Sequence, residues 1–166
     1  MATKKPPRPP YEPSKHMRDA LAALAAEKIA HKKKRQATRK AVADELRVSE
    51  QSHARVAEHT PWTEETVRSI ATEYQVPAKT PGKTPPPYEP SPEFTAALAA
   101  WEKAEDSLGE KMLAARKAVA DELRTSGVSQ AKVAAHTPWT EVTVRTIAQE
   151  FNVPPLRKPT VRSIRD

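Results

Sequence analysis

Two pairs of adjacent carboxylates, Asp44-Glu45 and Asp121-Glu122, come nearest to a catalytic pattern in this sequence. Paired carboxylates serve general acid–base catalysis when both can reach one substrate. In a helix of 3.6 residues per turn, neighbouring side chains point about 100° apart, and no nucleophile or base accompanies either pair. We therefore interpret both pairs as parts of a solvated helix face, and we predict that the protein is not an enzyme.

The histidines offer little for metal chemistry. His59 and His136 open two copies of the hexapeptide HTPWTE, but no second ligand follows at a spacing typical of a metal site. The chain also has no cysteine and no glycine-rich phosphate loop. We expect these histidines to lie at helix ends, and we predict neither a metal site nor a cofactor.

The composition favours a polyanionic partner. The 166 residues carry a net charge of +7, and the sequence pI is about 9.7, which suits nucleic acid or an anionic membrane surface. No apolar run approaches the roughly 20 residues that span a bilayer, and the basic N-terminus lacks the apolar stretch of a secretory signal. We expect no membrane partner and a cytoplasmic, nucleoid-associated location, with which the lack of cysteine agrees.

The chain is a tandem repeat. Shifting the sequence by 77 positions aligns 10–77 with 87–154 without a gap, and more than half of the aligned pairs are identical. Each copy begins with PYEPS, passes through RKAVADELR and HTPWTE, and ends with Val-Pro. Such self-similarity indicates an internal duplication. The 17 prolines crowd around the ends of the copies, which separates extended connectors from long proline-free blocks.

Both copies are predicted to be helical throughout. They are rich in Ala, Glu, Lys, Arg and Leu, with apolar residues three or four positions apart and no alternation of the strand type. In copy 2, a continuous helix over about 94–124 would carry an apolar stripe that only Glu105 interrupts. The stripe consists of Leu98, Trp101, Leu108, Met112, Ala115 and Val119. In copy 1 the stripe fades into HKKKR at 31–35, so either the two long segments have different roles or copy 1 divides into two helices there.

Copy 2 contains clear signals for two further helices. Gly127 suits the left-handed position after a helix, Ser129 suits the N-cap of a short helix over about 130–136, and Pro138 ends that helix. Thr140 can cap a third helix, with Glu141 in its first turn. The side chains expected to be buried around this turn are Val133, Ala134, Trp139, Val144, Ile147 and Ala148.

This pattern resembles the helix-turn-helix of bacterial DNA-binding proteins. Counted from Gln130, the family's small, turn, apolar, capping and two buried positions fall on Ala134, Pro138, Trp139, Thr140, Val144 and Ile147. Counted from His53, they fall on Ala57, Pro61, Trp62, Thr63, Val67 and Ile70. The resemblance covers about 39–76 and 116–153. Both copies have Pro where the family usually has Gly in the turn.

With this resemblance, the predicted fold is all-α. It has two tandem modules, each a long N-terminal helical segment followed by a tri-helical helix-turn-helix core, joined by a proline-rich linker. The predicted boundaries are 1–13 for a disordered basic tail, 14–77 for module 1, 78–90 for the linker, 91–154 for module 2 and 155–166 for a flexible basic tail. A polyproline II linker over 77–87 would reach about 34 Å, close to one turn of DNA, so one chain could occupy two adjacent grooves.

The resemblance implies that the third helix of each module enters the major groove of double-stranded DNA. The implied base-facing residues are Thr63, Glu65, Arg68, Ser69 and Thr72 in copy 1, and Thr140, Val142, Arg145, Thr146 and Gln149 in copy 2. Arg68 and Arg145 suit guanine, Gln149 suits adenine and Val142 suits the thymine methyl group. The implied phosphate contacts are Ser52, His53, Arg39 and Lys40 in copy 1, and Ser129, Gln130, Arg116 and Lys117 in copy 2. Because the outward residues differ between copies, we expect related but non-identical half-sites.

Several single-residue interpretations compete. Trp62 and Trp139 could stack on bases, but a core position is favoured. Glu64 and Glu141 could accept from cytosine, but stabilising a helix N-terminus is favoured. The HKKKR run suits a phosphate surface and a solvated helix face equally.

Two other functions remain open for the whole chain. One is a helical adaptor whose long amphipathic segments pair with a partner, including a homodimer through the long helices. The other is a DNA-packing protein of low sequence preference. The motif at 51–76 is itself slightly acidic, so flanking basic segments would have to supply much of any salt-sensitive DNA affinity.

Overall fold

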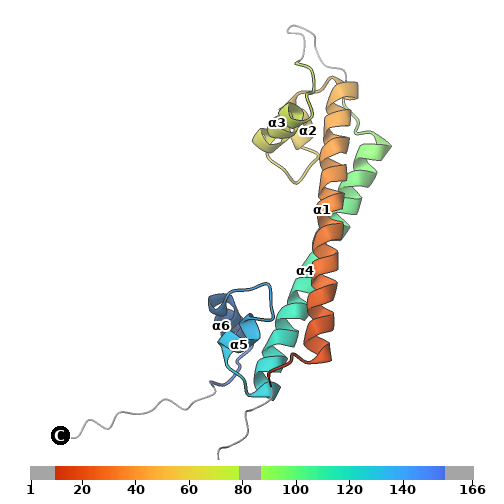
Figure 1. Cartoon of the computed structure of the whole chain (residues 1–166). Coiled ribbons are helices and arrows are strands. Elements are labelled where there is room, and N and C mark those ends of the chain that lie inside the picture. The colour runs from red at the N-terminus through yellow and green to blue at the C-terminus, as the bar shows by residue number, and fades with distance from the viewer. Residues whose placement is uncertain (1–9, 79–86, 156–166) are drawn as a thin grey trace, which may run out of the picture. The chain divides into compact units, whose positions relative to one another are not determined.

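The computed structural model describes residues 10–78 and 87–155, and every regular element in these ranges is an α-helix (Figure 1). The all-α prediction is therefore confirmed. The helices are α1 (Lys15–Ser49), α2 (His53–Ala57), α3 (Glu64–Glu73), α4 (Pro92–Ser126), α5 (Gln130–Ala134) and α6 (Glu141–Glu150). The conformations predicted for most of the two tails and of the linker concern residues outside the described ranges.

The two long helices, α1 and α4, are each continuous over 35 residues. The alternative in which copy 1 divides at HKKKR is therefore wrong, and Gly109 lies within α4 without ending it. A serine precedes each helix and caps it: the backbone N–H groups of Met17 and Phe94 donate to the hydroxyl oxygens of Ser14 and Ser91, each at 3.2 Å. A serine oxygen in this position satisfies an N–H group that has no partner within the helix.

The chain forms two compact units, and neither coincides with one sequence repeat. Unit 1 consists of Met1–Ala25 and Glu110–Asp166, whereas unit 2 consists of Ala26–Gly109. Each unit thus combines the short helices of one repeat with the first part of the other repeat's long helix. This division differs from the predicted one at 14–77 and 91–154.

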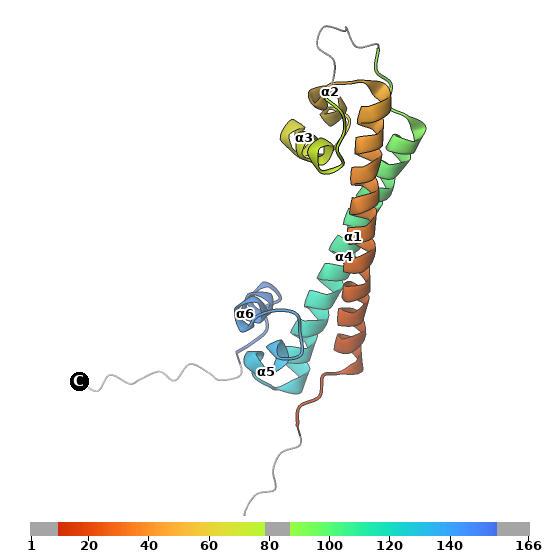
Figure 2. The same cartoon turned by 45° about the horizontal axis from the view of Figure 1, so that its top comes forward.

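The core of unit 1 includes a side chain from the start of α1. Met17 is fully buried there, against Val119 of α4, Val133 of α5 and Ile147 of α6. Figures 1 and 2 show α5 and α6 beside the last turns of α4, with the first turns of α1 alongside. The three helices of one repeat leave an apolar gap, and a side chain from the other repeat closes it.

Unit 2 is built in the same way. Phe94, at the start of α4, is 1% exposed and packs into a cluster with Val42 of α1, Val56 of α2, and Val67 and Ile70 of α3. Burying a side chain of this size stabilises a fold by roughly 1.5–3 kcal/mol. Met17 and Phe94 are matching positions of the repeat, so each copy completes the core of the other.

Two buried carboxylates bind the segment that each copy contributes to the core of the other. Glu122 accepts hydrogen bonds from the Tyr11 hydroxyl at 2.9 Å and from the Ser14 backbone N–H at 3.2 Å. Glu45 accepts from the Ser91 hydroxyl at 2.5 Å and from the Ser91 backbone N–H at 3.4 Å. The repeated PYEPS segment therefore binds the repeated ADELR segment of the other copy.

This arrangement corrects one expectation. Glu45 and Glu122 are only 6% and 4% exposed, so the interpretation of both carboxylate pairs as a solvated face is wrong for these two residues. Periodicity could not reveal it, because the hydroxyl and N–H donors that stabilise the buried charge come from a distant segment. Burial, together with the hydrogen bond to the Glu122 carboxylate, raises the pKa of Tyr11 well above its usual value.

The histidines of HTPWTE also contact the PYEPS segments. The ring of His136 lies edge-on to Tyr11 at 5.4 Å between centroids, and His59 lies in the same way against Tyr88 at 5.2 Å. Each follows a short helix, since their backbone N–H groups donate to Val133 and Val56. The prediction of a helix-end position is confirmed. No group of three or more potential metal-ligating side chains occurs in the described part of the chain.

Candidate nucleic-acid interface

Two matching surfaces carry all the predicted base-facing residues, one on α2–α3 in unit 2 and one on α5–α6 in unit 1. The third helix of each begins where the sequence predicts. Thr63 is the N-cap of α3 and accepts from the Thr66 N–H at 3.3 Å, and Thr140 is the N-cap of α6 and accepts from the Thr143 N–H at 3.3 Å. The extended backbone of each threonine turns the chain from the Pro-Trp loop into the helix.

One side of each of these helices is buried. The side chains that face the core are Val67, Ile70 and Ala71 in α3, and Val144, Ile147 and Ala148 in α6. Val144, Ile147 and Ala148 were predicted from their spacing, and Val67 and Ile70 from the helix-turn-helix pattern. Their burial fixes the rotation of each helix about its own axis, and therefore fixes which side chains point outward.

All ten predicted base-facing residues are exposed. They are Thr63, Glu65, Arg68, Ser69, Thr72, Thr140, Val142, Arg145, Thr146 and Gln149. Val142 is 69% exposed even though it is apolar. Its partner position in the other repeat is Glu65, so the two outward surfaces differ in chemistry while the inward surfaces are nearly the same.

The two outward arginines are held loosely. Arg68 donates to Glu64 at 2.7 Å and Arg145 donates to Glu141 at 3.4 Å, each one helical turn away. Exposed pairs of this kind contribute little stability, typically below about 1 kcal/mol. A guanidinium has five N–H donors, so most of its donors can still bond another acceptor.

Two outward threonines have a restricted hydrogen-bonding role. The hydroxyl groups of Thr72 and Thr146 donate to the backbone oxygens of Arg68 and Val142, both at 3.1 Å. With the proton used inside the helix, each side chain presents acceptor lone pairs and a methyl group to its surroundings. Such a group suits an amino group or a thymine methyl better than it suits a base acceptor.

The predicted phosphate residues at the start of α2 and α5 divide into two kinds. Ser52 and Ser129 are exposed N-caps that accept from the N–H groups of Arg55 and Lys132 at 3.1 and 3.4 Å. Each hydroxyl group keeps its own donor, which can bond a phosphate. The residues that follow them, His53 and Gln130, are half-buried.

Arg39 and Arg116, predicted to contact phosphates, have a structural role in ion pairs. Arg39 of α1 forms an ion pair with Glu73 at the end of α3, and Arg116 of α4 forms the matching pair with Glu150 at the end of α6. The signal was present in the sequence, because these arginines and glutamates recur unchanged in both copies. The other two predicted phosphate residues, Lys40 and Lys117, are exposed, and Lys40 contacts Asp44 at 2.8 Å.

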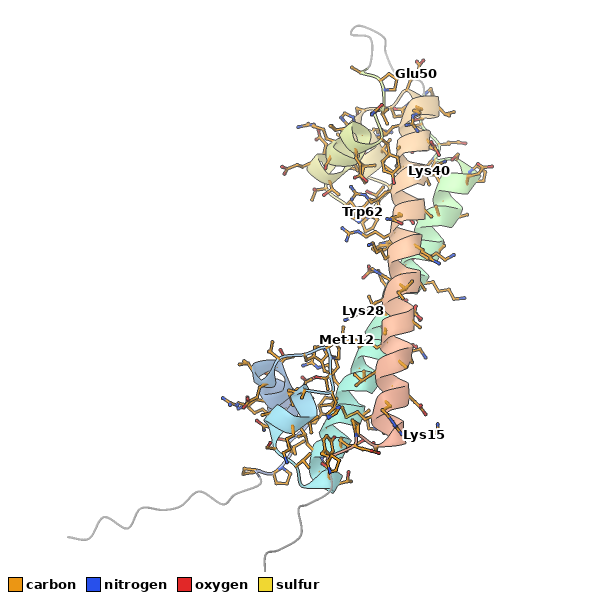
Figure 3. The ribbon with its side chains drawn as sticks, in the orientation of Figure 1. Lys15, Lys28, Lys40, Glu50, Trp62 and Met112 are labelled. Atoms are coloured by element: carbon orange, nitrogen blue, oxygen red, sulfur yellow. The ribbon has the colours of Figure 1, made fainter. Side chains whose placement is uncertain are left out.

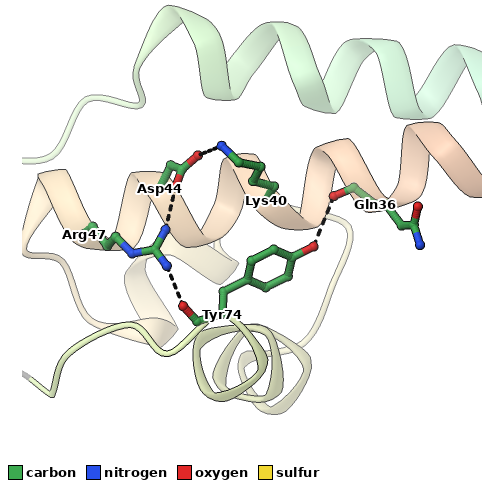
Figure 4. Close-up of polar contacts among 5 residues, drawn as sticks. All are labelled: Gln36, Lys40, Asp44, Arg47 and Tyr74. Atoms are coloured by element: carbon green, nitrogen blue, oxygen red, sulfur yellow. Dashed lines mark hydrogen bonds and ion pairs between the residues drawn. The ribbon is translucent and has the colours of Figure 1, made fainter.

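A small polar network holds α3 against α1 (Figure 4). The Tyr74 hydroxyl donates to the backbone oxygen of Gln36 at 3.4 Å, while Arg47 donates to the backbone oxygen of Tyr74 and to Asp44. The hydrogen bond from Lys40, with the charges of Lys40 and Arg47, lowers the pKa of Asp44 below its usual range. Arg124 and Phe151 repeat the arginine–carbonyl contact in unit 1. In each unit, these hydrogen bonds attach the C-terminal end of the third helix to the long helix.

The tryptophans of the turns are packed, as predicted. Trp139 lies against the core of unit 1, and Trp62 lies against the core of unit 2, where its ring is 6.0 Å from that of Trp101. Figure 3 shows Trp62 in the loop between α2 and α3. Both rings are only half-buried, and they contact protein side chains of their own unit.

The two surfaces differ in charge. The segment 51–76 has two basic residues against four acidic ones, and it includes Glu64 and Glu65 side by side at the start of α3. The segment 128–153 has two of each. A polyanion would therefore be repelled slightly by the first surface unless neighbouring basic residues compensate.

Comparison of the chain with models of known protein families gives no match, and neither the curated proteins nor the solved structures contain a significant match. Within the described ranges, no helix combines the length and the apolar character needed to cross a bilayer.

Proposed function

We propose that this chain is a sequence-specific double-stranded DNA-binding protein, either a transcriptional regulator or a plasmid or phage control protein, with α2–α3 and α5–α6 acting as two helix-turn-helix motifs. One observation carries the proposal. Every side chain that the helix-turn-helix pattern assigns to bases is exposed, and every one that it assigns to the core of the third helix is buried.

The chemistry of the outward residues supports direct base recognition. Arg68 and Arg145 are exposed, keep several unused donors, and can bond O6 and N7 of guanine together. Val142 offers an apolar contact to a thymine methyl, and Gln149 offers the bidentate contact that suits adenine. The exposed serine caps Ser52 and Ser129 would bond phosphates at the groove edge.

The differences between the copies specify the kind of site. The outward pairs that differ are Glu65/Val142, Ser69/Thr146 and Thr72/Gln149. We infer that the two motifs recognise related but non-identical half-sites in adjacent major grooves. One chain would then bind the two half-sites that a conventional helix-turn-helix protein binds as a homodimer. A homodimer through the long helices stays a prediction, which sedimentation equilibrium would test. A protein of this kind would act at the nucleoid, in the cytoplasm.

Selection of bound duplexes from a random pool, at a stated salt concentration, tests the proposal. We expect enrichment of two short motifs at a fixed separation, with different bases at the positions facing Glu65 and Val142. Arg68→Ala and Arg145→Ala should each relax the preference in one half-site. Arg18→Ala serves as a charge-matched control, since Arg18 is exposed near the start of α1.

The alternatives give different results in the same experiment. A helical adaptor predicts that no duplex is enriched and that both arginine variants bind DNA as the unaltered chain does. A DNA-packing protein predicts a uniform loss of affinity on every duplex, with no motif in the selected pool. Either outcome would overturn sequence-specific recognition.

A further inference from the structure

A basic stripe runs along α1 within unit 2. Lys28, Lys32, Arg35 and Arg39 follow one another at intervals of four, three and four residues, which places them on one face of the helix. The first three are exposed and make no ion pair with another described residue. Figure 3 labels Lys28 on the α1 ribbon.

The stripe lies on the face of α1 that carries α3. Arg39, its last member, pairs with Glu73 at the end of α3. The neighbouring Gln36 accepts from Tyr74, the C-cap of the same helix. The C-terminal end of α3 is therefore anchored beside the stripe.

Ring contacts place the beginning of α3 near the same stretch of α1. The His31 ring is 4.6 Å from Trp101, and Trp101 is 6.0 Å from Trp62. Trp62 directly precedes Thr63, the N-cap of α3. Lys32 and Arg35 follow His31 within about one helical turn, so the stripe occupies the stretch of α1 that these ring contacts link to the start of α3.

The stripe belongs to copy 1 alone. The matching positions in copy 2 are Glu105, Gly109, Met112 and Arg116. Copy 1 is also the copy whose short helices carry the excess of acidic residues, including Glu64 and Glu65 at the start of α3. The extra positive charge therefore occurs in the unit whose outward helix needs it for contact with a polyanion.

We propose that Lys28, Lys32 and Arg35 form a phosphate-binding stripe that grips the backbone of the duplex whose major groove receives α3. This inference rests on the proposed DNA-binding function and adds a second contact surface to it. The stripe covers about 10 Å along α1, which is the axial length of about three phosphates on one strand at 3.4 Å each. The proposal assigns Lys32 and Arg35 of the HKKKR run to phosphate binding.

Salt dependence gives a direct test with the full chain. The variant Lys28→Gln/Lys32→Gln/Arg35→Gln removes the stripe, and Lys33→Gln/Lys34→Gln/Lys103→Gln removes the same charge from exposed positions of unit 2 off the stripe. Each phosphate contact contributes about 0.9 to the slope of log K against log salt. We expect the stripe variant to reduce that slope by about 2 to 3, and the control variant to reduce it by less than 1.

The readout separates this proposal from the broader one. The slope is measured on a random-sequence duplex, where base recognition plays no part, and the base preference is measured on selected duplexes. A reduced slope with unchanged base preference supports the stripe, whereas equal slopes for the two triple variants would overturn it. If Arg68→Ala and Arg145→Ala leave the base preference unchanged, sequence-specific recognition fails while the slope still decides the stripe. Circular dichroism confirms that all variants remain folded.

Discussion

Replacing Ser91 with alanine should cost far more stability than the same change at Ser14, its counterpart in the repeat. Each serine caps a long helix through its hydroxyl oxygen, and losing such a cap costs about 1 kcal/mol. The Ser91 hydroxyl also donates to the buried carboxylate of Glu45 at 2.5 Å. In the other unit, Glu122 is bonded by the Tyr11 hydroxyl and the Ser14 backbone N–H, both of which survive Ser14→Ala.

The expected difference follows from that second bond. A hydrogen bond to a charged group contributes about 1.5–3 kcal/mol, so Ser91→Ala should lose about 2.5–4 kcal/mol in unit 2. Ser14→Ala should lose about 1 kcal/mol in unit 1. Native-state hydrogen exchange at the amides of Val42 and Val119, which are buried matching positions in the two units, measures the opening free energy of each unit separately.

Two outcomes would refute this reasoning. Equal losses for both variants would mean that the Glu45 carboxylate does not depend on the Ser91 hydroxyl. A loss of about 1 kcal/mol or less for Ser91→Ala would mean that the cap is the only contribution, and that the hydroxyl adds nothing to the backbone N–H that also bonds Glu45.

Three further predictions concern packing, backbone and charge. Ile147→Ala should lower the free energy of unfolding in urea by about 2–5 kcal/mol, because the side chain is fully buried. Val142→Ala should change that free energy by no more than about 0.5 kcal/mol and should weaken only DNA binding. Similar losses for both variants would contradict the assigned rotation of α6. Gly127→Ala should lower the free energy of unfolding by about 1–2 kcal/mol, because Gly127 has φ +62°, which an alanine rarely adopts. The cost is purely one of backbone strain, since an added Cβ would meet no other atom within 4 Å. An unchanged urea midpoint would show that the left-handed backbone is not needed. The lowered pKa of Asp44 means that its ionised form stabilises the fold at neutral pH, and that this contribution is lost as the pH falls through the lowered pKa. Lys40→Gln should raise the pKa of Asp44 in an NMR titration. An unchanged pKa would show that Lys40 is not its main cause.

The local features of the fold could be predicted because their signals are local. Ser129 and Thr140 cap the helices that they were expected to cap, and Gly127 adopts the left-handed conformation expected after α4. Each of these depends on a residue and its neighbours within one helical turn. The buried stripe of α6 follows from periodicity in the same way.

The exchange between the repeats could not be predicted from those signals. Met17 and Phe94 precede the predicted apolar stripe, and periodicity does not show that each enters the core built by the other copy. Glu45 and Glu122 look like surface residues until their distant donors are known. The one available signal was that PYEPS recurs unchanged outside the region of helix-turn-helix resemblance, which indicates a structural partner that both copies share.

The strongest single test is the discrimination ratio of Arg145→Ala, measured as the affinity for a selected duplex divided by that for a scrambled duplex at one salt concentration. A lost bidentate contact to guanine is worth about 1–3 kcal/mol, so the ratio should fall by roughly 5- to 150-fold, while Arg18→Ala leaves it unchanged. A ratio that Arg145→Ala does not alter would contradict recognition of bases by α6, and with it the proposed function of the chain.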